Sequence, residues 1–213
     1  MKFPMISGVM ITYNEVEHID EILTLVTPHV DEMVVLDGGS TDGTVEALQK
    51  WSDDNKIRLY KFPYMRWELF GDQKNLACSF TKGRWIFLVD PDERFEEGLL
   101  EGLSRSVAWG EENEVECLRL PRRNFLDGVQ TDVYPDYQLR LFRSYCRWVY
   151  RVHEELVGFK GMQGESSKHI LHYKTTDKQH KQIGYYEGLI SRYGHTLRDW
   201  DQEDAHNKVL TDV

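Results

Sequence analysis

Short apolar runs alternate with amphipathic stretches through the first half of the chain. The run MVVL, which ends at Leu36, is typical of a buried strand, whereas Ile19, Ile22 and Val26 recur at helical spacing. Strands that alternate with helices favour parallel pairing through right-handed crossovers. The pattern predicts strands at residues 5–12, 31–37, 57–62 and 84–90, and helices at 16–30, from Ser40 onward and at 71–81.

After about residue 111 the pattern changes to strands joined by polar turns. We expect strands at residues 115–121, 137–143, 148–152 and 155–159, and then a helix at 183–197. The predicted fold class is α/β, with a mostly parallel central sheet flanked by helices and a smaller strand-rich C-terminal part. We expect one domain over residues 1–213, in two halves that meet near residue 110. The polar C-terminal stretch also fits one module of a longer protein.

Composition places the chain among globular proteins and excludes several classes. Its 213 residues are 40% hydrophobic and 29% charged, which is enough to build a core without disulfides. The net charge of −10 argues against a general nucleic-acid binder, since such affinity comes from neutralising phosphates. No apolar run approaches the roughly 18 residues of a membrane helix. Without a signal peptide or a paired-cysteine motif, Cys78, Cys117 and Cys146 are expected to be buried reduced thiols in a cytoplasmic protein.

Three predicted strands of the first half end in polar residues of one kind. These ends read TYNE after the first strand, DGGSTDG after the second and DPDE after the fourth. Because the carboxyl ends of parallel strands meet at one edge of a sheet, the three ends should converge. Carboxylates in Asp-x-Asp spacing, as at Asp90 and Asp92, suit hard divalent ions such as Mg²⁺ or Mn²⁺. The sequence therefore predicts a binding site at this edge.

The same residues carry a resemblance to a known family. ITYNE, VLDGGSTDGT and FLVDPDE together resemble the inverting glycosyltransferases of family 2, which have the GT-A fold. YPDYQLRLFR, WxxxxHE and HILHY resemble its branch of lipooligosaccharide-core glucosyltransferases, and the resemblance runs from about residue 5 to about residue 175. It implies a metal-dependent enzyme that moves a hexose or deoxyhexose from a UDP-sugar to a hydroxyl of a glycan acceptor. Residues 1–110 would bind the donor and residues 111–213 the acceptor.

The resemblance also implies roles on the donor side. Asp37 would accept the N3–H of uracil, and Gly38-Gly39 would admit backbone close to the nucleotide. Asp92 would bind Mn²⁺ or Mg²⁺ directly, with Asp90 nearer the ribose and the waters of the metal. Ser40, Thr41 or Asp42 is expected to cap the next helix instead. The residues expected around the base and ribose are Thr12, Asn14 and Glu15.

Several roles in the second half stay open between alternatives. Asp136 is our first candidate for the general base that takes the acceptor proton, and Glu154 is its rival. Arg140 shares a strand face with Asp136, so it either lines the acceptor or diphosphate side or pairs with surface acids. His172 is a candidate third metal ligand, and His153 is a weaker second choice. Lys74 either faces the diphosphate or is a solvated helix lysine.

Two other functions remain as alternatives. A sugar nucleotidyltransferase normally has a glycine-rich phosphate loop after its first strand, where this chain has Tyr13-Asn14-Glu15. A non-catalytic nucleotide-sugar or glycan-binding module would not need the Asp90/Asp92 pair and a candidate base. The expected partners are a UDP-sugar and a glycan, with no nucleic acid, and the sequence predicts no oligomeric state.

Overall fold

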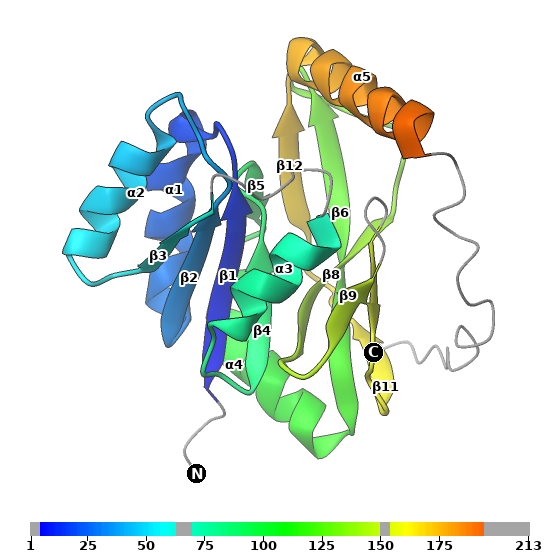
Figure 1. Cartoon of the computed structure of the whole chain (residues 1–213). Helices are drawn as coiled ribbons and strands as arrows, with labels where there is room; N and C mark the ends of the chain where they lie inside the picture. Colours follow the sequence, from blue (N-terminus) through cyan, green and yellow to red (C-terminus); the bar gives the residue numbers. More distant parts are fainter. Residues whose placement is uncertain (1–4, 63–69, 150–153, 194–213) are drawn as a thin grey trace.

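A computed structural model describes residues 5–62, 70–149 and 154–193 of the chain as a curled central sheet with helices on both faces (Figure 1). The first half follows the predicted alternation. Its elements are β1 (Ile6–Thr12), α1 (Val16–Val26), the 3₁₀ turn η1 (Thr27–His29), β2 (Glu32–Asp37), α2 (Thr44–Asp53), β3 (Arg58–Lys61), α3 (Phe70–Ser79) and β4 (Trp85–Val89).

The first half closes with β5 (Glu93–Phe95) and α4 (Leu99–Glu112). The second half contributes mostly strands, and its elements are β6 (Val115–Leu126), β7 (Val129–Gln130), β8 (Asp136–Arg143), β9 (Arg147–Val149), β10 (Glu155–Val157), β11 (Met162–Glu165), β12 (Ile170–Lys174) and α5 (Thr176–Tyr193). The long sheet has the order β3-β2-β1-β4-β8-β6-β12-β5, and β7 and β11 also pair with β6. Strands β9 and β10 form a separate antiparallel pair.

Residues on the two faces of the sheet bury two apolar clusters. Side chains alternate along a strand, so Met10 packs on the face covered by α1, α2 and α4, whereas its neighbour Val9 packs on the face covered by α3. The three cysteines lie buried and unpaired in the second cluster. Burial raises the pKa of each thiol to about 12.

The strand directions decide which residues can meet. Strand β4 is parallel to β1, which is parallel to β2, so these three strands end at one edge. Strand β8 is antiparallel to both β4 and β6, and β12 is parallel to β6. The start of β8 and the end of β12 therefore lie at the same edge, where helix α5 crosses the sheet (Figure 1).

The predicted α/β class with a mostly parallel sheet is confirmed, and several element boundaries differ from the predicted ones. The predicted helix 16–30 ends at Val26, because Pro28 has no N–H to donate to a continuing helix. The predicted helix 183–197 instead begins at Thr176, and residues 194–197 lie outside the described part. Strand 115–121 continues to Leu126, and of strand 148–152 only the first two residues are described.

None of the helices in the described ranges is long and apolar enough to cross a membrane.

Candidate active site

The carboxylate of Asp37 organises the glycine loop that follows β2. Asp37 is only 1% exposed, and it accepts hydrogen bonds from the backbone N–H of Gly39 at 2.9 Å and of Ser40 at 3.1 Å. The Ser40 hydroxyl donates to its other oxygen at 2.5 Å. Gly39 has a φ of 98°, which residues with a Cβ rarely adopt, whereas Gly38 has no positive φ. Of the two glycines, Gly39 is therefore the one whose backbone conformation requires glycine.

The end of β1 is joined to this loop by side-chain hydrogen bonds. The backbone N–H of Asn14 donates to the Ser40 hydroxyl at 2.8 Å, and Asn14 Oδ1 accepts from the backbone N–H of Thr41 at 2.8 Å. Thr12 lies opposite Asp37 in the sheet register. The Thr12 hydroxyl is buried and has no hydrogen-bond partner among the described residues. The first two strand ends thus form one polar unit at the sheet edge.

The N-cap position of α2 is Gly43, and of the three residues that the sequence suggested, Asp42 binds the first turn from the position before it. Its carboxylate accepts from the backbone N–H of Thr44 at 3.0 Å, at the start of α2, and from that of Val16 at 3.2 Å, at the start of α1. It therefore stabilises the first turns of two helices at once.

Arg140 connects two carboxylates of the Asp-Pro-Asp-Glu segment. It is 3% exposed, and its guanidinium donates to Glu93 at 3.1 Å from Nε and 2.6 Å from Nη2. Nη2 also binds the carboxylate of Asp90. Burial raises the pKa of Asp90, but the adjacent charge of Arg140 outweighs it, so the pKa lies below its usual range. Arg140 thus pairs with the fully buried Glu93 and the half-buried Asp90 of the strand end, and not with surface acids.

Asp92 lies between a histidine and a lysine. His172 Nε2 is 3.3 Å from Asp92 Oδ2, and Lys178 Nζ is 3.3 Å from the same oxygen. Lys178 Nζ also binds Glu15 Oε2 at 2.8 Å. Burial raises the pKa of Asp92, but a hydrogen bond and positive charge from a protonated His172, together with the charge of Lys178, outweigh burial and hold the pKa well below its usual range. Asp92 is therefore ionised at neutral pH.

A chain of hydrogen bonds fixes the tautomer of His172. Asn124 Nδ2 donates to the Asp136 carboxylate at 2.9 Å, and this sets the orientation of the amide because an ionised carboxylate only accepts. Asn124 Oδ1 then faces His172 Nδ1 at 2.7 Å, so Nδ1 carries the proton. In the neutral ring, the lone pair of Nε2 faces the Asp92 oxygen. Two acceptors at 3.3 Å repel each other unless a proton or a metal ion lies between them.

The ligand atoms of Asp92 and His172 suit a divalent cation, although the described residues do not form a complete metal site. Carboxylate oxygen and imidazole nitrogen, as in Asp92 and His172, are ligands that Mn²⁺ accepts. Within the described ranges, no three His, Cys, Asp or Glu side chains are close enough together to hold a metal. Lys178 instead bridges Asp92 and Glu15. The other histidine of the sequence analysis, His153, lies outside the described residues.

A cavity of about 420 Å³ lies beside Arg140, on the face of the sheet that α3 covers. Both candidate bases line it, and so does Lys74, which is 3.4 Å from Glu154 Oε2 and lies over the ring of Trp148. Lys74 is 9% exposed and is therefore not a solvated helix lysine. The cavity is lined by Phe70, Lys74, Arg122, Asp136, Tyr137, Gln138, Leu139, Arg140, Trp148 and Glu154.

Asp136 is the more strongly held of the two candidate bases. Its Oδ2 accepts from Arg122 at 2.6 and 2.9 Å and from Asn124, whereas Oδ1 accepts from Gln138 at 2.8 Å. Burial raises the pKa of Asp136, and the hydrogen bonds from Asn124 and Arg122 lower it below its usual range. Oδ1 keeps a lone pair that a substrate hydroxyl could use.

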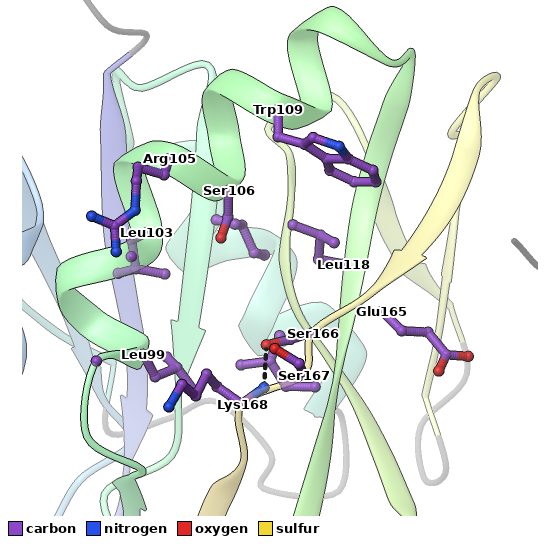
Figure 2. Close-up of a pocket in the computed structure, with 14 residues that line it drawn as sticks. Leu99, Leu103, Arg105, Ser106, Trp109, Leu118, Glu165, Ser166, Ser167 and Lys168 are labelled. Atoms are coloured by element: carbon purple, nitrogen blue, oxygen red, sulfur yellow. Dashed lines mark hydrogen bonds between the residues drawn. The ribbon is translucent and has the colours of Figure 1, made fainter. Parts of the chain in front are cut away.

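Figure 2 shows a second cavity, of about 430 Å³, on the opposite face of the sheet under α4. Leu99 and Leu103 of α4 line it together with Leu118 of β6, and the segment that includes Ser166 and Lys168 forms its rim. It contains none of the predicted site residues.

Comparison with known proteins identifies the family of this chain. A family model described as Glycosyl transferase family 2 matches residues 7–154. The chain belongs to glycosyl transferase family 2. The match runs from β1 to Glu154, so it includes both loops of the first two strands, the Asp-Pro-Asp segment and both candidate bases. The predicted resemblance is confirmed.

Family 2 relatives are found in several bacteria. The lipopolysaccharide core biosynthesis glycosyltransferase LpsC of Rhizobium meliloti is 31% identical over 150 residues, which are 67% of this chain and 54% of LpsC. The prophage-derived glycosyltransferase SunS of Bacillus subtilis is 25% identical over 73% of this chain and 36% of SunS. The chain thus spans about a third to about half of these relatives. A crystal structure of S. aureus TarS, at 18% identity, shares the fold, with a TM-score of 0.50 over 66% of this chain and 47% of TarS.

Four residues at this family 2 site were given no role in the sequence analysis. Glu93 directly follows the Asp-Pro-Asp spacing, so its position in the motif could have indicated it. The others gave no comparable signal, because they become neighbours of the site only through strand pairing and through the start of α5. These three residues are Arg122, Asn124 and Lys178.

Proposed function

We propose that this family 2 chain is a divalent-cation-dependent glycosyltransferase that moves a hexose or deoxyhexose from a UDP-sugar to a glycan hydroxyl with inversion. The observation that carries the proposal is the position of Arg140. Its guanidinium binds Asp90 on the donor side, and the same residue lines the cavity that holds both candidate bases. A donor at the strand ends and an acceptor in that cavity would therefore meet at Arg140.

The donor side would bind the nucleotide through the loops after β1 and β2. In this proposal Asp37 reads the N3–H of uracil through the one lone pair of Oδ2 that its loop leaves unused. Support comes from the buried Thr12 hydroxyl beside it, which costs free energy unless a ligand or water bonds it. Asn14 and Glu15 would line the ribose, and Gly39 allows the backbone to come close.

Asp92 and His172 would hold the divalent cation, which is Mn²⁺ or Mg²⁺ in the proposal. When His172 is neutral, its Nε2 lone pair faces Asp92 Oδ2, and a cation between the two atoms would remove their repulsion, which supports this assignment. When bound, such an ion stabilises the negative charge that develops on the departing diphosphate. Asp90 would keep its charge beside the site, because Arg140 holds it ionised.

On the acceptor side, we assign the general base to Asp136 and keep Glu154 as its rival. Arg122 and Asn124 orient the Asp136 carboxylate by hydrogen bonds to Oδ2. Among the described residues, Oδ1 accepts one hydrogen bond, from Gln138. The lowered pKa makes Asp136 a weak base, so proton transfer would be late, as the acceptor oxygen bonds to the anomeric carbon. Glu154 is paired with Lys74, which could instead face the diphosphate.

The proposal is tested by donor turnover. Release of nucleotide from UDP-glucose, UDP-N-acetylglucosamine and GDP-mannose is measured with Mn²⁺ and with EDTA, in the presence of oligosaccharides of the lipopolysaccharide core. These acceptors are chosen because LpsC is a lipopolysaccharide core biosynthesis glycosyltransferase. We expect cation-dependent release from a UDP-sugar and a product of inverted anomeric configuration by NMR. Donor binding with no turnover for any acceptor would favour the binding module, and consumption of UTP with a sugar phosphate would favour the nucleotidyltransferase.

The proposal also keeps the cytoplasmic location that the sequence predicts. Three buried thiols without a disulfide agree with a reducing compartment.

A further inference from the structure

We propose that Lys178 is a built-in counter-cation of the donor site, which competes with a divalent cation for Asp92 and Glu15 and thereby couples helix α5 to cation binding. This inference rests on the cation dependence in the proposed function. Lys178 belongs to none of the sequence motifs. It also lies outside the family match, which ends at residue 154.

The ammonium of Lys178 lies where a small cation would be attracted. It is 2.8 Å from Glu15 Oε2, after β1, and 3.3 Å from Asp92 Oδ2, after β4. The side chains of Glu15 and Asp92 are only 16% and 13% exposed, so their charges are weakly screened by solvent. A single ammonium therefore bridges carboxylates from two neighbouring strand ends and offsets one of their two negative charges.

Asp92 cannot serve Lys178 and a divalent ion equally well. The contact from Lys178 is made to Oδ2, the same oxygen that faces His172 Nε2. An ion held between Asp92 and His172 would repel an ammonium at that oxygen, because two positive charges would share one acceptor. Asp90 does not enter this competition, since its own counter-charge is Arg140. Binding of the ion must therefore weaken the hold of Lys178.

Helix α5 transmits this exchange because Lys178 lies in its first turn. The N-terminus of the helix is attached to the sheet by Thr176, whose backbone N–H and hydroxyl both bind the carboxylate of Asp127 in the β6–β7 turn. Within the described part of α5, Lys178 is the residue that contacts the carboxylates of Glu15 and Asp92. Release of Lys178 would remove one of the described contacts that hold the first turn of α5 at the strand ends, whereas the bond of Thr176 to Asp127 would remain.

The test measures binding of Mn²⁺ alone by calorimetry to the full chain and to Lys178→Met. Lys181→Met is the matched control, since Lys181 is an exposed lysine of the same helix. We expect Lys178→Met to bind Mn²⁺ about 10-fold more tightly than the wild type, because the ion no longer displaces an ammonium from two weakly screened carboxylates. Lys181→Met should match the wild type. Thermal unfolding of each variant verifies the fold, and Lys178→Gln replaces Lys178→Met if that variant is unstable.

Hydrogen exchange of the α5 amides gives a second measurement that needs no turnover. Mn²⁺ should speed exchange in the wild type, whereas Lys178→Met should exchange fast with or without the ion. Equal Mn²⁺ affinity, or weaker affinity in Lys178→Met, would overturn the competition while leaving the cation site intact. No Mn²⁺ binding by any variant would instead overturn the cation site of the proposed function and the competition with it. Exchange that does not respond to Mn²⁺ would overturn the coupling to α5.

Discussion

Replacing Arg140 by Met removes a buried guanidinium and leaves its two acidic partners in place. Glu93 is fully buried and receives two hydrogen bonds from Arg140, and Asp90 binds the same Nη2. Breaking a buried pair by deleting one partner costs about 3–5 kcal/mol. Arg122 Nη1 remains 3.6 Å from Glu93 and offsets part of the loss, so we expect about 3 kcal/mol. In a domain of this size, that lowers the melting temperature by about 6–12 °C.

The loss of stability in Arg140→Met should also depend on pH and should be larger at higher pH. Burial already raises the pKa of Glu93 in the wild type, and loss of the Arg140 charge would raise it further. The folded variant therefore gains more stability than the wild type as Glu93 takes up a proton at falling pH. Urea unfolding should therefore give a larger difference from wild type at pH 7.5 than at pH 5.5. The double variant Arg140→Met/Glu93→Gln should recover at least half of the loss.

An exposed arginine is the control for this measurement. Arg84 is 65% exposed and lies 3.9 Å from Glu111, so Arg84→Met should cost less than about 0.5 kcal/mol. A loss below about 1 kcal/mol for Arg140→Met, or a deficit that is the same at both pH values, would show that Arg140 does not compensate these carboxylates.

Three further predictions concern the proposed reaction. Asp92→Ala should keep the fold and lower transfer about 10²–10⁴-fold, and wild-type-like turnover would contradict the cation assignment. Asp37→Ala should weaken UDP binding about 10- to 150-fold by calorimetry, and equal wild-type affinity for UDP and GDP would refute its role in reading uracil. Asp136→Asn should lower transfer about 10²–10⁴-fold with donor affinity within a few-fold. If Glu154→Gln shows this behaviour instead and Asp136→Asn remains active, Glu154 is the base.

The donor half could be predicted closely because its signals are local. Buried strands such as β2 and β4 are continuous apolar runs, and each ends at a polar motif that stops the strand. Helix α4 was missed although Leu99, Leu103 and Val107 recur at helical spacing and are buried, so its pattern was available in the sequence. The start of α5 was missed for another reason. Its first turn is polar, and the cap is the Thr175 hydroxyl, which accepts from the backbone N–H of Lys178.

The pairings between distant strands could not be predicted in the same way. Nothing in the local pattern of residues 136–143 states that β8 runs antiparallel between β4 and β6, and this insertion is what brings Arg140 to Asp90. The chain from Asp136 through Asn124 to His172 likewise joins β8, β6 and β12. Such contacts depend on which strands become neighbours, and period-two alternation carries no information about that choice.

The charges of the site tie the two halves of the chain together. Both aspartates of the Asp-Pro-Asp segment lie in the first half, and each takes its counter-charge from the second half. Arg140 of β8 pairs with Asp90, and Lys178 of α5 pairs with Asp92, which also contacts His172 of β12. Strand β8 also covers the edge of β4 that would otherwise be unpaired. A fragment that ended near residue 110 would expose that edge and leave both carboxylates without these cations. The strand-rich half therefore supplies the electrostatic environment of the donor site as well as the wall of the acceptor cavity.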